Sequence, residues 1–528
     1  MPDHQHPQHA PSPNPSPVPS PLIDPDAVLL GLDLGTQSAR AVAVDGTGRT
    51  VGAASRPLTS RREGVRHEQD PEQWWSALAD ACREALAGIA PERVRGLAVD
   101  ATSGTILLAD GHGTPLTPGL MYDDGRARSC TERVNTTGAA VWEASGYRSM
   151  QPSWALPKLL WLLDQGPLPA GARLLHQPDL ITWRLTGRQT AADASHALKT
   201  GYDLVEERWP EAELAALGVP HQLLPDVVRP GTVLGTVCAD AARATGIPAG
   251  TPVVAGMTDG CAAQIGAGAL APGAWNSVLG TTLVLKGVSS RLVRDPAGVV
   301  YCHRGPGGTW LPGGASSSGA GVIARHFPGA DLDALTRQAA AVSSTSAASS
   351  ASSTTASGSA AVAYPLTGGG GERFPFRAPG ASPFVLGRPS GEAERFHAFL
   401  LGVACVERLC FDYLDHLGAP VDGAVTLTGG GARNPYWSQL RADLLGRTVR
   451  LPEQSGSATG MAVLAATASG ATLEDAAAAM VRVRTELHPD PARTARLLPR
   501  YLDFADELTR RGWLEPAVAA HARRKAEQ

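Results

Sequence analysis

Lysine is nearly absent from this sequence. The 528 residues contain 46 basic side chains, and only four of these are lysine: Lys158, Lys199, Lys286 and Lys525. Asp and Glu together number 50, so the formal net charge is -4. A chain with this balance has no excess of positive charge to attract a nucleic acid or an acidic membrane surface. We therefore expect neither of them as a partner.

Cysteine pairs and long apolar runs are also missing. The seven cysteines are scattered and form no C-x-x-C motif, which argues against a disulfide framework and a zinc site. No apolar run reaches the roughly 18 residues that a membrane-spanning helix needs. Residues 1–26 are rich in Pro, Ser and His and lack the apolar stretch of a secretory signal. We expect a disordered tail there, although its histidines could bind a metal, and a cytoplasmic protein.

The usual nucleotide-binding loop is a further absence. No Gly is followed by Lys, so the pattern G-x-x-x-x-G-K-[ST] does not occur, and the glycine-rich loop of protein kinases is missing too. Any phosphate site must therefore use other backbone turns as its source of N–H donors.

What the chain has instead is an alternation of short apolar runs and tight glycine turns. Asp70 and Pro71 are typical of a helix start, as N-cap and first helical residue. The predicted elements are strands at 28–34, 39–45 and around 51, a helix at 70–87 and a strand at 94–100. This order predicts an α/β domain with a mixed sheet that opens with a β-meander.

A similar opening recurs in the second half of the chain. The turns at 34–37 (LGTQ) and 279–282 (LGTT) are near copies about 245 residues apart. Gly-Thr is a common hairpin turn, but two of them at domain starts indicate a duplicated architecture. The expected parts are a tail at 1–26, an N-terminal domain at 27–268, a C-terminal domain at 269–512 with a low-complexity insertion at 339–363, and a C-terminal tail at 513–528.

Several residues in these turns suit phosphoryl transfer, which needs phosphate donors, a carboxylate near Mg²⁺ and a base for the attacking hydroxyl. The two Gly-Thr turns can supply N–H and hydroxyl donors. Asp33 ends the first strand, where it can hold Mg²⁺ through water or merely cap the turn. Asp259 follows an apolar strand in a Gly-rich turn that suits a general base, although Asp-Gly is also a plain turn. The glycine run at 429–431 would let a helix N-terminus approach a phosphate or a flat ring.

Taken in order, these motifs resemble the FGGY carbohydrate kinases. The set comprises D-x-G-T-x-S-x-R at 33–40, EQDPEQWW at 68–75, GMTDG at 256–260, LGTT at 279–282, P-L-x-x-x-x-x-E-R-F-P at 365–375, TGGGARN at 428–434 and G-M-A-V-L-A-A at 460–466. The resemblance covers most of the chain. It implies two ribonuclease-H-like domains of the actin/hexokinase superfamily with an ATP and sugar cleft between them. It also implies transfer of the ATP γ-phosphate to a primary hydroxyl of a ketopentose, polyol or glycerol.

The resemblance implies a role for each matching residue. Asp259 matches the catalytic base, and Asp33 matches the carboxylate near Mg²⁺ and the transferred phosphate. The residues that match the ATP and phosphate motifs are Asp33, Gly35, Thr36, Gln37, Ser38, Arg40, Gly280, Thr281, Thr282, Gly314, Gly429, Gly430, Gly431, Ala432 and Asn434. ATP and Mg²⁺ are thus the expected cofactors, and a homodimer is one expected assembly.

The identity of the sugar depends on fewer residues. Family members specific for xylulose end the strand before the sugar pocket in Met-His, where this chain has Thr102-Ser103. The segment MYDDGRA at 121–127 resembles the family's Trp-x-Asp-x-Arg sugar segment, which implies Ser103, Asp124, Arg126 and Asp259 as substrate-binding residues. The stretches SWALPKLLWLL and DASHALKTGYD resemble a plant and cyanobacterial subgroup that looks like D-ribulose kinases. We therefore predict D-ribulose as the substrate.

Other functions of the same fold stay open at this point. D-xylulose or a pentitol is the alternative substrate within the family. A non-catalytic actin-like ATPase switch would use the same paired hairpins, and a degenerate family member could bind a sugar as a sensor. The presence of Asp33, Asp259 and the residues around Ser103 and Asp124 argues against both of these.

Overall fold

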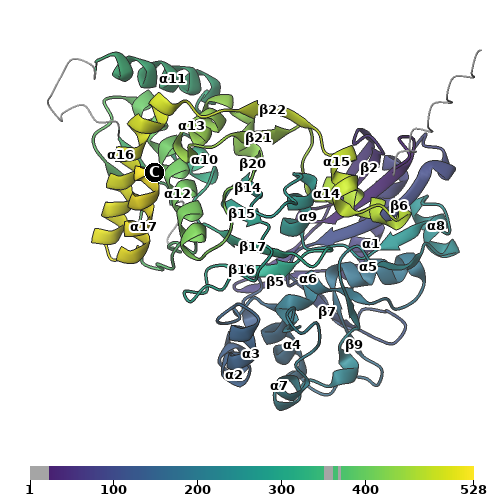
Figure 1. Ribbon diagram of the computed structural model, residues 1–528. Coiled ribbons are helices and arrows are strands. Elements are labelled where there is room, and N and C mark those ends of the chain that lie inside the picture. The colour runs from purple at the N-terminus through teal and green to yellow at the C-terminus, as the bar shows by residue number, and fades with distance from the viewer. Residues whose placement is uncertain (1–22, 350–360, 367–369) are drawn as a thin grey trace, which may run out of the picture.

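Two α/β halves lie side by side in the structure (Figure 1). The computed structural model describes residues 23–349, 361–366 and 370–528. The tail predicted at 1–26 therefore falls almost wholly outside the described residues, as does the middle of the insertion predicted at 339–363. The first part of that insertion is the end of a helix, α11 (Leu332–Ser349). None of the described helices combines the length and apolar character that a membrane span requires.

The N-terminal half is built on a six-stranded mixed sheet that begins with the predicted meander. The strands in spatial order are β12 (Val233–Thr236), β13 (Pro252–Val254), β6 (Val94–Ala101), β1 (Val28–Leu34), β2 (Ser38–Asp45) and β3 (Thr50–Pro57). β1 pairs antiparallel with β2 and parallel with β6, and β6 pairs parallel with β13. Helix α1 (Pro71–Ala85) covers β2 and β3, and the Asp70 side chain accepts a hydrogen bond from Glu72 N at its start. The predicted α/β domain is confirmed.

The C-terminal half repeats this plan in a seven-stranded sheet. Its strands in spatial order are β16 (Tyr301–Arg304), β17 (Trp310–Ala315), β15 (Leu283–Gly287), β14 (Trp275–Leu279), β20 (Val425–Thr428), β21 (Val449–Pro452) and β22 (Val483–Leu487). β14 pairs antiparallel with β15 and parallel with β20, and β20 pairs parallel with β21. The pairing directions match those of the first sheet strand for strand, with β16 as an additional edge. The duplication predicted from the two turns is therefore present in the topology.

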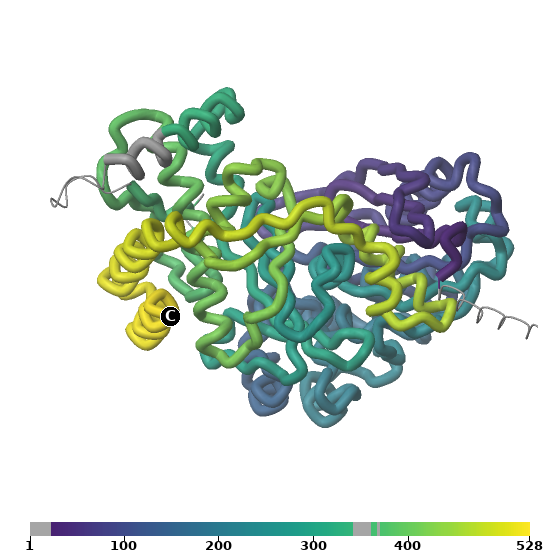
Figure 2. Tube along the Cα trace, turned by 45° about the horizontal axis from the view of Figure 1, so that its top comes forward, coloured from purple at the N-terminus to yellow at the C-terminus, as the bar shows by residue number. Residues whose placement is uncertain are grey.

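A pair of helices crosses between the halves. These are α9 (Asp259–Gly266) and α14 (Ser457–Ala465), and α14 also packs on β1 and β6. Their approach is so close that a Cβ atom on Gly460 would lie 1.8 Å from the carbonyl oxygen of Ala262. The chain thus returns late to the N-terminal sheet, where α14 and α15 (Leu473–Met480) lie against β1, β2 and β6 (Figures 1 and 2).

The N-terminal half also carries a large insertion between β6 and β12. It contributes to a second, five-stranded sheet in the order β4 (Arg61–Glu63), β5 (Arg66–Gln69), β8 (Gly119–Leu120), β7 (Ile106–Ala109) and β9 (Arg173–His176). The helices and short helical turns around that sheet are η2 (Arg126–Cys130), α2 (Thr131–Thr137), α3 (Ala139–Ala144), α4 (Ala155–Leu163), α5 (Gln177–Thr186), α6 (Ala194–Ala197), η3 (Leu198–Thr200) and α7 (Glu211–Ala216). The remaining helix of this half, α8 (Ala239–Thr245), packs beside α1.

Several helices cover the outer side of the C-terminal sheet. They are α10 (Gly321–His326), α12 (Glu392–His416), α13 (Pro435–Leu445), α16 (Pro491–Arg510) and α17 (Pro516–Glu527). Helix α16 begins at Pro491, where the Asp490 side chain caps it by accepting hydrogen bonds from Ala492 N and Arg493 N. Residues 513–528, expected as a tail, contain α17, whose Val518 and Ala522 are buried in the core.

Candidate active site

Three acidic side chains meet at one edge of the N-terminal sheet. Asp33 and Asp100 are register partners at the carboxyl ends of the parallel strands β1 and β6. The next residue of β6, Ala101, forms a parallel bridge to Thr258, which immediately precedes Asp259. Since the carboxyl ends of parallel strands share one edge of a sheet, the three carboxyl groups converge there. The sequence predicted a role for Asp33 and Asp259, and the structure adds Asp100 beside them.

Asp33 and Asp100 are too deeply buried to be two independent anions. Asp33 is 4% exposed and Asp100 is not exposed at all. Burial, together with the nearby charges of Asp33 and Asp259, raises the pKa of Asp100 well above its ordinary value. No N–H or O–H group reaches either oxygen of Asp100 among the described residues. A protonated Asp100 can hydrogen-bond to Asp33, and this arrangement keeps two like charges from being buried together.

Asp259 differs in position from what the sequence suggested. It was expected in a turn directly after a strand, but β13 ends at Val254 and Asp259 is the first residue of helix α9. Its side chain reaches solvent, while the protein packed around it and the nearby Asp33 raise its pKa. Three groups lower the pKa of Asp259 and favour its carboxylate form: the Gly260 N–H, Lys199 and His196. A partly desolvated carboxylate of this kind is suited to accept a proton.

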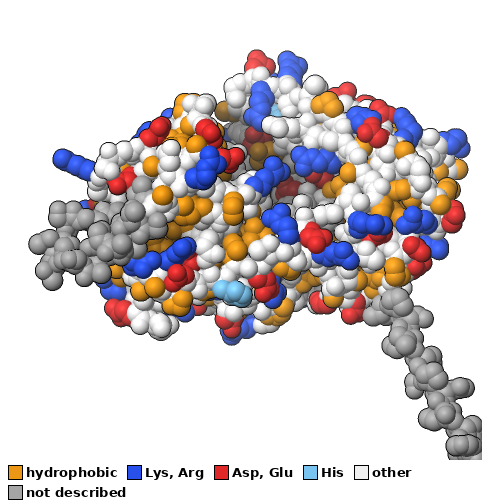
Figure 3. Space-filling view, turned by 90° about the horizontal axis from the view of Figure 1, so that it is seen from above, with side chains coloured by type: hydrophobic (Ala, Val, Ile, Leu, Met, Phe, Trp, Pro, Cys, Tyr) orange, Lys and Arg blue, Asp and Glu red, His pale blue; other side chains and the backbone are white. Residues whose placement is uncertain are grey.

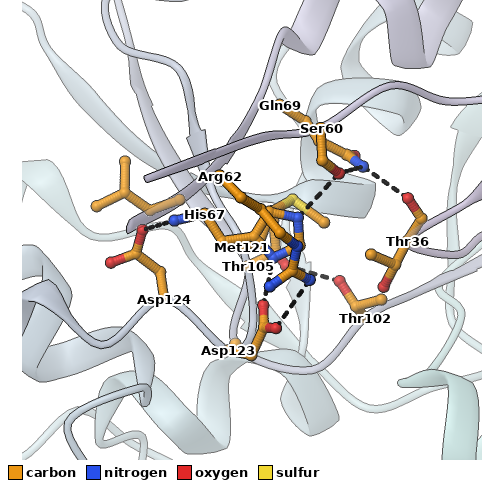
Figure 4. A network of polar contacts seen from close by, with 12 residues as sticks. Thr36, Ser60, Arg62, His67, Gln69, Thr102, Thr105, Met121, Asp123 and Asp124 are labelled. Atoms are coloured by element: carbon orange, nitrogen blue, oxygen red, sulfur yellow. Dashed lines mark hydrogen bonds and ion pairs between the residues drawn. The ribbon is translucent and has the colours of Figure 1, made fainter. Parts of the chain in front are cut away.

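The first predicted phosphate turn joins β1 to β2 beside these acids. Gly35 N donates to Ser38 O at 3.1 Å, which closes the turn around Thr36 and Gln37. Arg40 points back along β2, where its guanidinium lies 3.4 Å from Asp33 Oδ2 and 3.1 Å from Ser38 Oγ. Gln69 Nε2 donates to Thr36 O at 2.7 Å and fixes the turn from the far side (Figure 4).

The second predicted phosphate turn joins β14 to β15 and is one residue shorter. Gly280 N donates to Thr282 O at 3.0 Å, with Thr281 exposed at the tip. Backbone N–H groups of Ala320 and Gly321 donate to Gly280 O and Thr281 O, so that the start of α10 supports the turn. The turn therefore leaves the Thr281 and Thr282 hydroxyls at the surface on a rigid base.

The predicted adenosine segment follows β20. Gly429 and Gly430 are exposed, whereas Gly431 and Ala432 are buried against β14. Asn434 is engaged within the protein: its side chain caps α13 by accepting from Trp437 N and donates to Thr336 Oγ1. Gly314 was expected along the nucleotide groove, but it lies inside β17, and the Phe374 ring fills the space over its Cα.

The residues predicted to bind the sugar differ in whether their polar side-chain atoms already have partners within the protein. The hydroxyl of Ser103 is buried and has no hydrogen-bond partner among the described residues, which leaves its hydrogen-bonding capacity unused within the protein. Asp124 and Arg126 instead bind each other: Arg126 donates to Asp124 through Nε at 2.9 Å and Nη2 at 2.7 Å, and His67 N donates at 2.7 Å. Burial alone would raise the pKa of Asp124, but these hydrogen-bond donors hold that pKa below its ordinary value. Figure 4 shows Asp124 pointing away from Thr36 and Thr102.

Sequence reasoning missed the accessible carboxylate of the same segment. Asp123 is 32% exposed and binds His67 Nδ1 at 2.5 Å and Arg62 Nη2 at 3.1 Å. His67 Nε2 continues this network to Ser60, which also binds Gln69 and thereby links it to the first phosphate turn (Figure 4). The double aspartate in MYDDGRA was the available signal, but the motif match directed attention to the second of the two residues.

The surroundings of Asp33 fit a hydrated Mg²⁺ ion better than a directly ligated metal. Within residues 23–349, 361–366 and 370–528, no group of three or more His, Cys, Asp or Glu side chains is arranged to hold a metal ion. Mg²⁺ prefers carboxylate oxygens and retains several of its waters. Asp33, with the donor-free oxygens of Asp100 behind it, offers that kind of ligand. The surface between the two halves is hollowed, and acidic and basic side chains border the hollow (Figure 3).

Comparisons with known proteins agree over nearly the whole chain. The family model described as "FGGY family of carbohydrate kinases, N-terminal domain" matches residues 28–266, and the model of the C-terminal domain matches residues 275–469. A xylulose kinase of Streptomyces coelicolor is 31% identical over 477 residues, which cover 88% of this chain and 92% of that protein. A xylulose kinase of Escherichia coli is 29% identical and covers 83% of this chain and 88% of its own length. The crystal structure of a xylulose kinase from Rhodospirillum rubrum superposes with a TM-score of 0.77 at 27% identity, covering 91% of this chain and 98% of that one.

Proposed function

Since this chain belongs to the FGGY family of carbohydrate kinases and is an ATP-dependent sugar kinase, we propose that its substrate is a ketopentose and that this ketopentose is D-ribulose. The product is then D-ribulose 5-phosphate. The observation that carries this choice is the free hydroxyl of Ser103, at the position where xylulose-specific members are expected to have an imidazole. A short hydroxyl leaves more room in the pocket and can both donate and accept a hydrogen bond.

Asp259 is the general base in this proposal. It accepts the proton of the terminal sugar hydroxyl while the hydroxyl oxygen forms a bond to the γ-phosphorus and the bond to the leaving ADP oxygen breaks. The raised pKa of Asp259 suits this step, because a more basic carboxylate accepts the proton more readily. The neighbouring Asp33 does not compete for the proton if it faces the metal and shares a hydrogen bond with Asp100.

The two Gly-Thr turns hold the phosphates from opposite halves of the protein. Gly35, Thr36, Gln37 and Ser38 approach from the N-terminal sheet, and Gly280, Thr281 and Thr282 approach from the C-terminal sheet. Asp33 would hold Mg²⁺ through water, and the ion would supply positive charge to neutralise the phosphates. Arg40 balances the charge of Asp33 from the side. Gly429 and Gly430 offer exposed backbone to the nucleoside.

On the sugar side, we assign Ser103 and Asp259 as direct contacts. Asp124 and Arg126 act from behind, because their polar groups are bound to each other and to Glu68. Their pair fixes the segment that carries Asp123 and Tyr122, both of which are accessible. Closure of the two halves on the bound sugar would exclude water, which competes as phosphoryl acceptor.

The experiment that tests the substrate is a panel of ketopentoses and pentitols with ATP and Mg²⁺. We expect the highest kcat/KM for D-ribulose. A higher value for D-xylulose than for D-ribulose would refute the choice of sugar and leave the kinase assignment in place. Hydrolysis of ATP that does not depend on any added sugar would instead favour an ATPase switch.

D-xylulose is the second candidate substrate. Relatives that match most of this chain at 29 to 31% identity are named xylulose kinases. D-Ribulose and D-xylulose differ only in configuration at C3, so discrimination between them depends on the few groups that face that carbon. The replacement Ser103→His tests this directly, since it restores the expected imidazole and should shift the kcat/KM ratio toward D-xylulose.

A further inference from the structure

Three of the four lysines in this chain surround the candidate active site. Lys158 lies on α4, Lys199 in the short η3 segment and Lys286 on β15. Lys286 is close enough to Lys199 to affect its protonation, and Lys199 in turn affects Asp259. The other 42 of the 46 basic side chains are arginine, whose planar guanidinium differs from the compact ammonium group of lysine.

Two of these lysines bind consecutive carbonyl groups of the loop that carries Ser103. Lys199 Nζ donates to Ser103 O at 3.0 Å. Lys158 is fully buried and its Nζ donates to Gly104 O at 2.6 Å, to Met121 O at 2.8 Å and to Leu120 O at 3.3 Å. Lys158 thereby ties the Ser103 loop to the start of the segment that leads to Asp123.

Both lysines are held in place by their own surroundings. Lys199 Nζ lies 5.8 Å from the ring centroid of Trp154, the residue that precedes α4. Its stem packs on Gly104, where a Cβ atom would lie 3.1 Å from Lys199 Cδ and where φ is +98°. The segment before Lys199 is anchored as well, since Thr258 N donates to Ser195 Oγ and His196 Nε2 donates to Ala101 O.

The outcome is a loop whose backbone is fixed and whose hydroxyl is free. Lysine ammonium groups bind the carbonyls of Ser103 and Gly104, and the Thr102 hydroxyl is bound to Thr105 and Gln177. Of the three hydroxyl groups in residues 102–105, that of Ser103 has no partner among the described residues. We propose that Lys199 is a positioning residue that orients the Ser103 hydroxyl toward the sugar, while Lys158 holds the neighbouring Gly104 carbonyl in place. This inference rests on the proposed sugar contact of Ser103.

The position of Lys199 also links sugar binding to the base. Lys199 binds the Ser103 loop, and its positive charge favours the Asp259 carboxylate. An arginine would spread the same charge over a planar fork with five N–H donors, and a single carbonyl would leave most of these unsatisfied. The Lys199 ammonium group donates to the Ser103 carbonyl and favours the Asp259 carboxylate, and it leaves fewer N–H donors unsatisfied than an arginine would.

The test is a double-mutant cycle between Lys199→Met and Ser103→Ala. Loss of a charge-assisted hydrogen bond should raise KM for the sugar by about tenfold or more in Lys199→Met. We expect KM for ATP to stay within about twofold. In the Ser103→Ala background the Lys199→Met change should have a much smaller effect on the sugar KM, because both changes then act on one contact. Addition of n-propylamine to Lys199→Ala should recover part of the lost sugar affinity.

The fourth lysine supplies the matched control. Lys525 lies on α17 and pairs with Asp415 at 3.5 Å, far from the site in the fold, so Lys525→Met should leave both KM values unchanged. Strictly additive effects in the cycle, an equal rise of both KM values, or a Lys199→Met protein that does not fold would each overturn the proposal. The wild-type sugar panel is measured first, and the cycle uses whichever sugar is preferred. A wrong sugar is therefore distinguished from a wrong role for Lys199.

Discussion

The two halves of this kinase share a topology but differ in charge at corresponding positions. In the N-terminal sheet, Asp33 is paired with Asp100 across β1 and β6. In the C-terminal sheet, the residue at the same distance before the Gly-Thr turn is Val278, and its partner across β14 and β20 is Thr428. An acid pair in one half thus corresponds to an apolar residue and a hydroxyl in the other.

This difference indicates that the two sheets of the duplicated fold serve different parts of the reaction. Mg²⁺ and a proton acceptor require carboxylates, and the N-terminal edge supplies three of them. A nucleotide carries its own negative charge, so carboxylates near its phosphates would repel it, and the neutral C-terminal edge avoids this. The shared hairpin gives both edges N–H donors, while the side chains beside it determine which part of the reaction each edge serves.

The largest effect should come from removal of Asp259, the proposed base at the charged edge. Asp259→Asn keeps the shape of the side chain but cannot take a proton, so kcat should fall by roughly a hundredfold or more. Binding of ATP, measured by calorimetry, should change little. Asp240→Asn serves as control, because the Asp240 side chain is 85% exposed on α8 and forms an ion pair with Arg243 of the same helix. Near-normal turnover of Asp259→Asn would remove Asp259 from the mechanism.

A direct exchange of the two edges is the next test. Asp33→Val places in β1 the residue that β14 has at the corresponding position. We expect kcat to fall about ten- to a hundredfold, because a preorganised charge beside the transferred phosphate is lost. The amount of Mg²⁺ needed for half-maximal rate should rise. Asp33→Asn separates charge from shape, and a variant with normal Mg²⁺ dependence would contradict the assignment of Asp33.

The neutral edge can be disturbed through its backbone. Gly429 has φ of +83°, and a Cβ atom on it would lie 2.7 Å from Leu279 O, so alanine cannot enter without moving the second turn. Gly429→Ala should raise KM for ATP about tenfold and leave KM for the sugar nearly unchanged. Gly446→Ala is the control: it has φ of +65° at the end of α13, but a Cβ atom there would lie at an ordinary contact distance of 3.7 Å from Thr494 Cγ2. Equal effects of the two replacements on KM for ATP would show a general loss of stability.

The halves also differ in how well the sequence predicted them. Both hairpins, the meander and the long helix α12 follow from apolar periodicity and glycine turns, because local patterns determine these elements. The return of α14 to the N-terminal sheet was not predicted, since a short apolar helix carries no signal for which of two sheets it covers. Gly460 permits its close approach to α9, but a single glycine in a sequence does not show which element it packs against.

The same limit applies to the predictions of site residues. A motif identifies residue types but does not show which way a side chain points, so Asp124 and Arg126 were predicted in the pocket while Asp123 was not. Gly314 lies in a strand, where alternate residues face opposite sides and the buried side cannot be told from the sequence alone. Lys158 and Lys199 were noticed only for their rarity, because their targets are backbone carbonyls far away in the chain.

The smallest expected effect concerns the pH dependence of the charged edge. Burial raises the pKa of Asp259, and Asp33 raises it further, while Lys199 is one of the groups that lower it. Because the base must be unprotonated, kcat/KM for the sugar should fall as the pH falls through this pKa, at a pH above that of an ordinary carboxyl group. In Lys199→Met one positive charge is lost, the carboxylate is less favoured, and the acid limb should move to higher pH. Lys525→Met should not move it. An acid limb that stays in place or moves to lower pH in Lys199→Met would show that the Lys199 charge does not act on Asp259, and the charged edge would then depend on its acids alone.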